Sequence, residues 1–363
     1  MNKIGWFGVI WLWCVSAQAA LVTNLYDARV PIAQQSSRAQ QQAAKDAFGQ
    51  VLVKIRGNRD ILDSELVRSK MEQAQDFIRQ YRFDSQSGQY YFIASFDPSK
   101  VDELVRSAGY PVWGSRRPST LLWLASQEGG KDQRSILSEQ STESMRTTVM
   151  DTARLRGIPL NLPLMDLDDL SQVGVYDIWG RFIDRLATAG NRYQVEAVLS
   201  ARLYPIERQT DLPGSLEQEV AAAANTQWQL DWNFALGQER EQGSLSGEDK
   251  QALLAELINQ HADRLAARFA VGAEGEGASV AVLQFSNVQD LATYVNISKV
   301  LLSLSVVSHV GLDSIEGHSG SFRVRLLGSE QDLLNAISLE RHFQRQLDAF
   351  GQPVGELQFI WVP

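Results

Sequence analysis

Apolar residues recur every three or four positions along much of the chain, which is the spacing of an amphipathic helix. The first such stretch begins at Ser36 or Ser37 and is predicted to end near Arg56, before Gly57. Its apolar face is formed by Ala44, Phe48, Val51 and Ile55. The same pattern predicts helices over residues 63–80, 97–107, 135–156, 175–187, 248–270 and 287–304, and one from 330 onward.

Segments of alternating or continuous apolar residues predict strands between these helices. The segment from Thr120 to Ala125 is apolar at nearly every position, so we expect it to be buried on both faces of a sheet. The other predicted extended segments are 21–32, 81–83, 89–96, 158–162, 193–203, 226–236, 280–285, 306–315, 322–326 and 356–362.

The order of these elements predicts a multi-domain protein of α/β and α+β class. Residues 20–112 have the order βααββα of a small α+β domain, and residues 113–271 suggest a mixed-sheet α/β domain. A glycine- and glutamate-rich linker, 272–277, precedes residues 278–363, whose order βαββαβ is that of a ferredoxin-like unit. In this last domain Ser286 and Gln289 form a candidate capping box.

The first 19 residues have the pattern of a cleavable signal peptide. Lys3 is followed by an apolar run of about 12 residues, shorter than the roughly 20 that span a bilayer. Ala17 and Ala19 form a small-x-small cleavage site, and Cys14, the single cysteine, follows Trp13, which does not fit a lipidation signal. We therefore expect export to the bacterial periplasm and no disulfide bonds. The net charge of −9 argues against nucleic acid or an anionic membrane as a partner.

Two groups of residues have ligand types found in metal sites. His309, Asp313, Glu316 and His318 surround one predicted strand and turn, where the alternative is a solvated hairpin end. Asp166, Asp168 and Asp169 lack the glycine and distal glutamate of a calcium loop and are better explained as a helix cap. We predict no metal and no cofactor.

The sequence also gives little support for catalysis. The segment Gly243–Gly247 has leucine where a nucleophile elbow has serine, and no pair among the 43 acidic residues stands out. We therefore predict a protein that is not an enzyme and has no catalytic residues.

The segment Trp113-Gly-Ser-Arg116-Arg117-Pro118 joins the first two predicted domains. Two arginines beside a tryptophan could bind an anion or a peptide. The same residues could instead form a seam between domains, with Trp113 in the seam and the arginines paired with neighbouring carboxylates, and this is the interpretation we favour.

With these residues described, the chain resembles an uncharacterised family of secreted Gram-negative bacterial proteins, domain-of-unknown-function family 2066. The resemblance rests on segments such as 47–57, 113–118, 122–124, 157–159, 163–166 and 177–180, with others at 96–97, 109 and 192–193. It implies export and an architecture shared along nearly the whole mature chain, and it supplies no catalytic residue.

Together these features predict a periplasmic accessory protein that binds another cell-envelope component. The open face or edge of the last sheet would pair with a partner strand, and Phe359 and Trp361 would take part if the final strand is an edge. The alternatives are a small-ligand sensor, which needs an apolar pocket, and a carboxylate-dependent hydrolase, which needs a cleft with perturbed carboxylates. An exposed apolar patch would favour protein binding.

Overall fold

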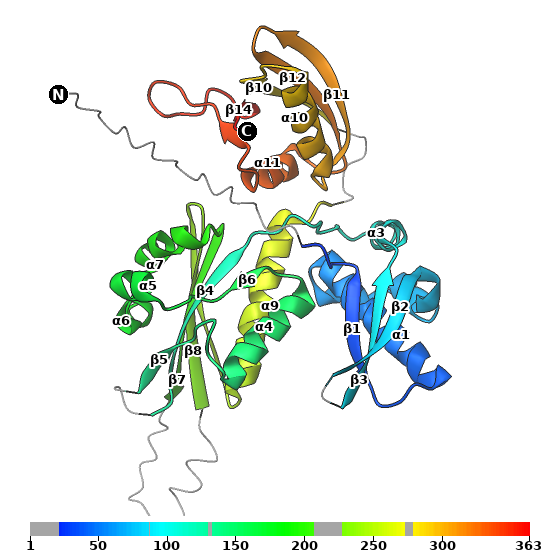
Figure 1. Ribbon diagram of the computed structural model, residues 1–363, viewed down its shortest axis with the longest axis vertical. Helices are drawn as coiled ribbons and strands as arrows, with labels where there is room; N and C mark the ends of the chain where they lie inside the picture. Colours follow the sequence, from blue (N-terminus) through cyan, green and yellow to red (C-terminus); the bar gives the residue numbers. More distant parts are fainter. Residues whose placement is uncertain (1–21, 87, 130–132, 207–226, 273–278) are drawn as a thin grey trace, which may run out of the picture.

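A computed structural model describes residues 22–86, 88–129, 133–206, 227–272 and 279–363. Over these residues the strands form three sheets, each with its own helices and its own apolar core (Figure 1). The mixture of helices and several sheets confirms the predicted multi-domain class. The predicted signal peptide, with Cys14, lies outside the described residues, as does all but Gly272 of the predicted linker.

The N-terminal domain packs a long helix, α1, on an antiparallel sheet of order β1-β3-β2. The helix begins where predicted, since the Ser36 hydroxyl accepts the Ala39 N–H, and it ends at Gly57, whose φ of 77° is left-handed. The elements are β1 (Asp27–Ile32), α1 (Ser37–Arg56), η1 (Arg59–Asp63), α2 (Glu65–Met71), η2 (Ala74–Phe77), β2 (Ile78–Gln86), β3 (Gln89–Phe96) and α3 (Pro98–Ser107).

The single helix predicted over 63–80 is wrong, because the chain breaks there into three shorter pieces. Ser64 is extended and its hydroxyl accepts the Val67 N–H, so a new helix starts at that point. Residues from Ile78 onward pair with β3 instead of continuing a helix. The tertiary contacts of the sheet thus override the local helical spacing.

The middle domain has a mixed sheet of order β5-β4-β7-β8-β9, with β6 also paired to β4. Helices α4 and α9 cover one face and α5 to α7 the other (Figure 1), so β4 is buried along almost its whole length, as predicted. The elements are β4 (Thr120–Gln127), β5 (Arg134–Ile136), α4 (Ser144–Arg156), β6 (Leu160–Asn161), α5 (Leu167–Gln172), α6 (Val175–Trp179), α7 (Ile183–Gly190), η3 (Asn191–Tyr193), β7 (Ala197–Ile206), β8 (Gln227–Leu236), β9 (Glu239–Gly247) and α9 (Lys250–Phe269).

Three predictions for this domain are corrected by the structure. The helix predicted over 135–156 starts only at Ser144, because residues 134–136 pair with β4. The helix predicted over 175–187 is interrupted at Arg181, whose φ is 62°. Strand β9 was not predicted: its side chains are polar and mostly exposed, so it lacks the apolar alternation of a half-buried strand.

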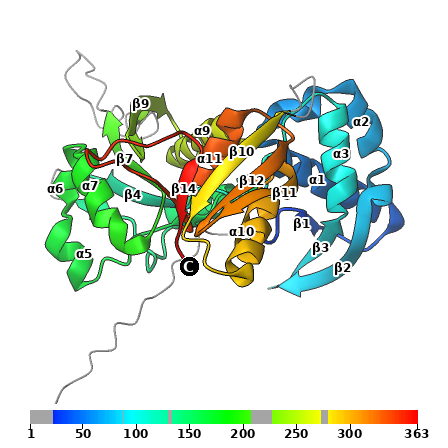
Figure 2. The same ribbon diagram turned by 90° about the horizontal axis from the view of Figure 1, so that it is seen from above.

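The C-terminal domain is consistent with the predicted ferredoxin-like unit: it has the order βαββαβ with one further short strand, β13, inserted before the last. Its sheet order is β11-β12-β10-β14-β13, with helices α10 and α11 packed on one face (Figure 2). The elements are β10 (Val280–Ser286), α10 (Leu291–Ser303), β11 (Val307–Glu316), β12 (Ser319–Leu326), α11 (Glu330–Ser338), β13 (Phe343–Arg345) and β14 (Gln358–Trp361).

Two details of this domain differ from prediction. Helix α10 is capped by Asp290, whose carboxylate accepts the Thr293 N–H, and not by Ser286. The final strand, β14, is not an edge, because β13 pairs along its outer side. Phe359 and Trp361 are consequently buried in the core and are not available to a partner strand.

Candidate functional site

Trp113 lies at the junction between the first two domains and is fully buried. Its indole packs in the core of the middle domain, while its backbone N–H donates to the Ile55 carbonyl of α1 at 2.7 Å. The preceding residue, Val112, pairs with Val271 through two backbone hydrogen bonds of 3.0 and 2.9 Å. The segment thus ties the end of α1 to the chain that follows α9.

Arg117 is the central charge of this junction and is almost completely buried. Its guanidinium stacks on the Trp113 ring, with the guanidinium carbon 3.9 Å from the ring centroid. Its donors all reach backbone carbonyl oxygens and not the carboxylate that we predicted. Nη2 donates to Lys54 (2.7 Å) and Trp113 (2.8 Å), Nη1 to Arg156 and Gly157 (3.1 Å each), and Nε to Gly114 (3.0 Å).

The carbonyls around Arg117 explain how the protein tolerates a buried cation. Lys54 lies in the last turn of α1 and Arg156 in the last turn of α4, so the guanidinium sits at the negative ends of two helix dipoles. Burial lowers the pKa of Arg117, but a guanidinium this well bonded stays protonated at neutral pH.

A second buried arginine, Arg156, strengthens the same contact. It donates from Nη2 to the Gly57 carbonyl at 2.7 Å and to the carboxylate of Asp263, and from Nη1 to the Asn259 side chain at 3.0 Å. Gly57 is required here, because a Cβ at this position would lie 2.3 Å from the Cβ of Ala266 on α9. Helices α1, α4 and α9 therefore meet at one closely packed point.

Arg116 connects the junction to the third domain. It forms an ion pair with Glu340, which is buried, and donates from Nη2 to Ser303 Oγ at 2.7 Å. Pro118 is buried and leads into Ser119 and β4. The structure thus brings Trp113, Arg116 and Arg117 together where the three domains meet, and neither Trp113 nor Arg117 reaches the surface.

The remaining candidate residues have ordinary structural contacts. Asp313 pairs with Arg323 across the β11–β12 hairpin that also carries His309 and His318. Over the described residues no group of three or more histidines, cysteines or carboxylates is arranged to hold a metal ion. Asp166 caps α5.

The buried carboxylate of Asp169 completes this acidic cluster. It accepts hydrogen bonds from the Arg192 guanidinium at 2.8 Å and from the Tyr193 hydroxyl at 2.5 Å. The Arg192 hydrogen bond holds the pKa of the neighbouring Asp166 far below its usual range. Asp166 and Asp169 therefore anchor α5, as the capping interpretation expects.

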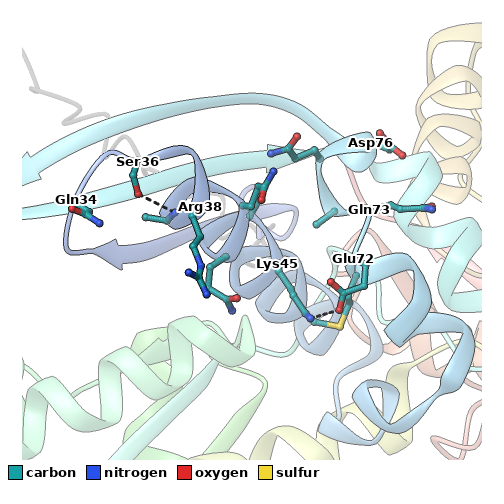
Figure 3. A pocket seen from close by; sticks show the side chains of 14 residues that line it. Gln34, Ser36, Arg38, Lys45, Glu72, Gln73 and Asp76 are labelled. Carbon is teal, nitrogen blue, oxygen red and sulfur yellow. Dashed lines mark hydrogen bonds and ion pairs between the residues drawn. The ribbon is translucent and has the colours of Figure 1, made fainter.

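A hollow in the N-terminal domain was not predicted from the sequence. Its volume is about 830 Å³, and it lies between the start of α1 and the segment 71–76 (Figure 3). Lys45 and Glu72 form an ion pair on its wall. The lining is rich in glutamine, with Gln34, Gln41, Gln42, Gln73 and Gln75. That glutamine content is the one signal in the sequence that marks the site.

A second hollow of about 460 Å³ continues from the first, since Ala44 and Gln75 line both. It reaches the sheet, where Ile78 and Tyr81 of β2 and Phe92 of β3 line it. β2 is an edge strand of its sheet, paired only with β3 in the described part of the chain. The two hollows form one groove, which we call the groove along α1; it is polar at one end and partly apolar at the other.

The helical layer α5–α7 of the middle domain exposes large apolar side chains. Leu167 and Tyr176 are 85 % and 71 % exposed. The full set within residues 164–182 is Leu164, Leu167, Leu170, Tyr176 and Phe182, which we call the α5–α7 patch. All five side chains come from one helical layer, so this layer is the candidate surface for a protein partner.

Asp102 has a carboxylate with a raised pKa, but it lines neither of the two hollows. Burial raises the pKa of Asp102 on α3, whose carboxylate accepts a 2.8 Å hydrogen bond from the Tyr26 hydroxyl. Asp102 does not line the groove along α1. It holds α3 against the segment before β1, so its environment gives no support to a hydrolase.

His261 on α9 is the one fully buried histidine of the described chain, and it predicts a pH dependence of stability. Its Nε2 lies 2.9 Å from Thr120 Oγ1 on β4. Burial lowers its pKa to about 3, whereas in the unfolded chain it titrates near 6.5. Between these values the unfolded chain binds a proton that the folded chain excludes. The free energy of unfolding should therefore fall by about 1.4 kcal/mol for each unit of acidification.

His261→Gln removes this titration and should reduce the acid sensitivity. Between pH 6.5 and 5 we expect the free energy of unfolding of the unmodified chain to fall by about 1.6 kcal/mol more than that of the variant, measured by urea unfolding. His309→Gln, which removes an exposed histidine, is the matched control and should keep the original slope. Equal slopes for the unmodified chain and His261→Gln would contradict the prediction.

The fold and surfaces define a three-part α/β protein with a ferredoxin-like C-terminal unit. Residues 276–354 match the profile of the family DUF2066, and residues 19–114 match a domain of unknown function, DUF8605. No curated protein matches the chain. The resemblance to the DUF2066 family is therefore confirmed in the C-terminal domain.

The matched region differs from the segments on which the resemblance was first based. Those segments lie between residues 47 and 193, outside 276–354, and the ones up to Gly114 fall within the DUF8605 match. The similarity to DUF2066 found in the comparison covers the C-terminal domain, not nearly the whole chain. A separate observation concerns membranes: none of the helices in the described ranges is long and apolar enough to cross one.

Proposed function

We propose that the protein is a non-enzymatic accessory protein of the bacterial periplasm that binds another protein of the cell envelope. The observation that supports this most strongly is the α5–α7 patch, because exposed large apolar side chains favour a protein partner over a small ligand. Aromatic residues such as Tyr176 and Phe182 are also enriched in protein interfaces. The predicted signal peptide supports the compartment.

The buried junction at Trp113 and Arg117 supports the same proposal in a different way. It fixes the middle domain against its neighbours through hydrogen bonds to helix ends. A preorganised arrangement of domains lowers the entropic cost of binding a partner at the α5–α7 patch. We therefore assign Trp113, Arg116, Arg117 and Pro118 a positioning role and not direct contact.

A photo-activated cross-linking residue at Leu167 or Tyr176, in intact cells, tests the proposal. Each should give a discrete adduct with one envelope protein. The same residue at Leu155, an exposed leucine on α4, is the matched control and should give none. The variant Leu167→Ser with Leu170→Ser should lower the yield about tenfold, with melting unchanged because both side chains are exposed. Absence of adducts from both patch positions, or the same adducts from Leu155, would contradict the proposal.

The groove along α1 favours a second candidate, a periplasmic small-ligand sensor. Its first hollow, of about 830 Å³, lies in the size range of ligand sites. The lining is polar and not the apolar pocket expected of a sensor, so its glutamine donors and acceptors suit a polar solute. A polar solute that raises the melting temperature of the unmodified chain, but not of Gln41→Leu with Gln75→Leu, would favour this candidate.

A further inference from the structure

The two edges of the C-terminal sheet differ in length and in how they are covered. On one side β13 has three residues, while on the other β11 runs for ten residues and pairs only with β12 among the described strands (Figure 2). An edge strand turns alternate backbone N–H and C=O groups outward, where they can bond to another strand. The long edge at β11 is therefore the position at which this sheet can be extended.

Helix α10 flanks this edge with exposed apolar side chains. Leu291, Val295 and Leu302 are exposed and lie on one side of the helix, about a third of a turn from the buried Ile297 and Leu301. A right-handed β10–α10–β11 connection turns that side outward over β11. The edge strand is thus bordered along its length by an apolar surface.

β11 itself contributes apolar side chains to the same surface. Val310 and Leu312 pair with Val324 and Phe322, which belong to the core, so they lie on the helix-covered face. Leu312 is nonetheless 44 % exposed, and Ile315 further along is also exposed. These side chains project past the helix at the open edge, where nothing in the described chain covers them.

The sequence of β11 is self-complementary about Gly311. If two copies of β11 pair antiparallel with Gly311 at the centre, His309 of each lies opposite Asp313 of the other on the open face. Val310 lies opposite Leu312 on the helix-covered face. The central pair, Val310 opposite Leu312, lies within the regular segment 309–312 of the β11–β12 register. Asp313 lies at the irregularity that follows Leu312, and within each copy its carboxylate pairs with Arg323.

From this pattern we propose that β11 pairs with β11 of a second copy of the chain, making one continuous sheet across a two-fold axis at Gly311. Such an interface is isologous, so each copy supplies the same surface. The two α10 helices then lie on the same face with their exposed sides turned toward the axis, which brings Leu291 of one copy toward Leu302 of the other. The proposal is independent of the α5–α7 patch and of its partner.

Cysteine substitution tests the register directly. In a Cys14→Ser background, Gly311→Cys should form an intermolecular disulfide on mild oxidation, because opposed strand residues have Cα atoms about 4.5–5.5 Å apart, within disulfide range. His309→Cys alone should not, since its symmetry mate is several residues away, but a mixture of His309→Cys and Asp313→Cys chains should. Cross-linking of His309→Cys alone, or none with Gly311→Cys, would overturn the proposal.

The oligomeric state of the full chain provides the second test. Light scattering should give the mass of a dimer for the unmodified chain and of a monomer for Leu312→Lys, because an edge lysine opposes strand pairing. Leu347→Lys, at an exposed leucine elsewhere in the same domain, is the matched control and should remain dimeric. A monomeric unmodified chain, or a dimer that persists in a folded Leu312→Lys variant, would rule out pairing at β11.

Discussion

Replacing Arg117 by methionine is expected to lower the free energy of unfolding by about 3–5 kcal/mol. The guanidinium is buried and its hydrogen bonds all end on backbone carbonyls. Methionine fills a similar volume but leaves those carbonyls without donors in a space that water reaches poorly, and each such group is costly. It also removes the positive charge from the ends of α1 and α4.

Urea unfolding followed by tryptophan fluorescence measures this loss, and two further variants define its cause. Arg117→Lys keeps the charge but offers a single nitrogen. Its free energy of unfolding should therefore fall by less than that of Arg117→Met, by about 1–3 kcal/mol. Arg154→Met removes an exposed arginine on α4, paired with Asp151 at the surface, and should cost less than about 1 kcal/mol. If Arg117→Met unfolds at the same urea concentration as Arg154→Met, the hydrogen bonds do not stabilise the junction.

Trp113→Ala should have an effect of similar size, about 3–5 kcal/mol, because it empties a fully buried site. It also removes the ring on which Arg117 stacks. The loss should therefore loosen the angle between the first two domains as well as the core. We expect a lower melting temperature, a changed small-angle scattering profile and a reduced yield of the cross-linked partner, all in one variant.

Trp361→Ala separates a general loss of stability from a change at the junction. Trp361 is also buried, but in the core of the C-terminal domain, away from Trp113. It should lower the stability of that domain and leave the arrangement of the first two unchanged. If Trp113→Ala abolishes partner capture while melting and scattering stay as they were, the positioning role is wrong and the segment contacts the partner itself.

Features that depend on neighbouring residues were predicted from the sequence. The Ser36 cap and Gly57 stop of α1, the buried strand at Thr120 and the βαββαβ order of the last domain follow from local spacing and turn chemistry. The helix predicted over 63–80 was wrong because its apolar spacing was helical, but the Ser64 cap starts a new helix and the pairing of β2 with β3 takes the residues from Ile78 onward into the sheet.

For the candidate sites too, the sequence predicted what depends on neighbouring residues, and the fold decided what depends on distant ones. The sequence placed Trp113, Arg116 and Arg117 in a segment between domains and favoured a seam over a binding surface, but it wrongly predicted carboxylate partners for Arg117. Only the fold brings the carbonyls of Lys54 and Arg156, which lie 63 and 39 residues away along the chain, to the Arg117 guanidinium. The groove along α1 was missed because its walls come from separate helices and share no motif.

By itself, then, the sequence determined the identity of most elements, the ferredoxin-like order and the residues between the first two domains, because these are encoded by contacts a few positions apart. The tertiary structure alone decided which strands are edges. β13, a three-residue strand without a periodic signal, covers β14 and buries Phe359 and Trp361. The open edge is left to β11, since strand order depends on contacts between distant segments that no local pattern records.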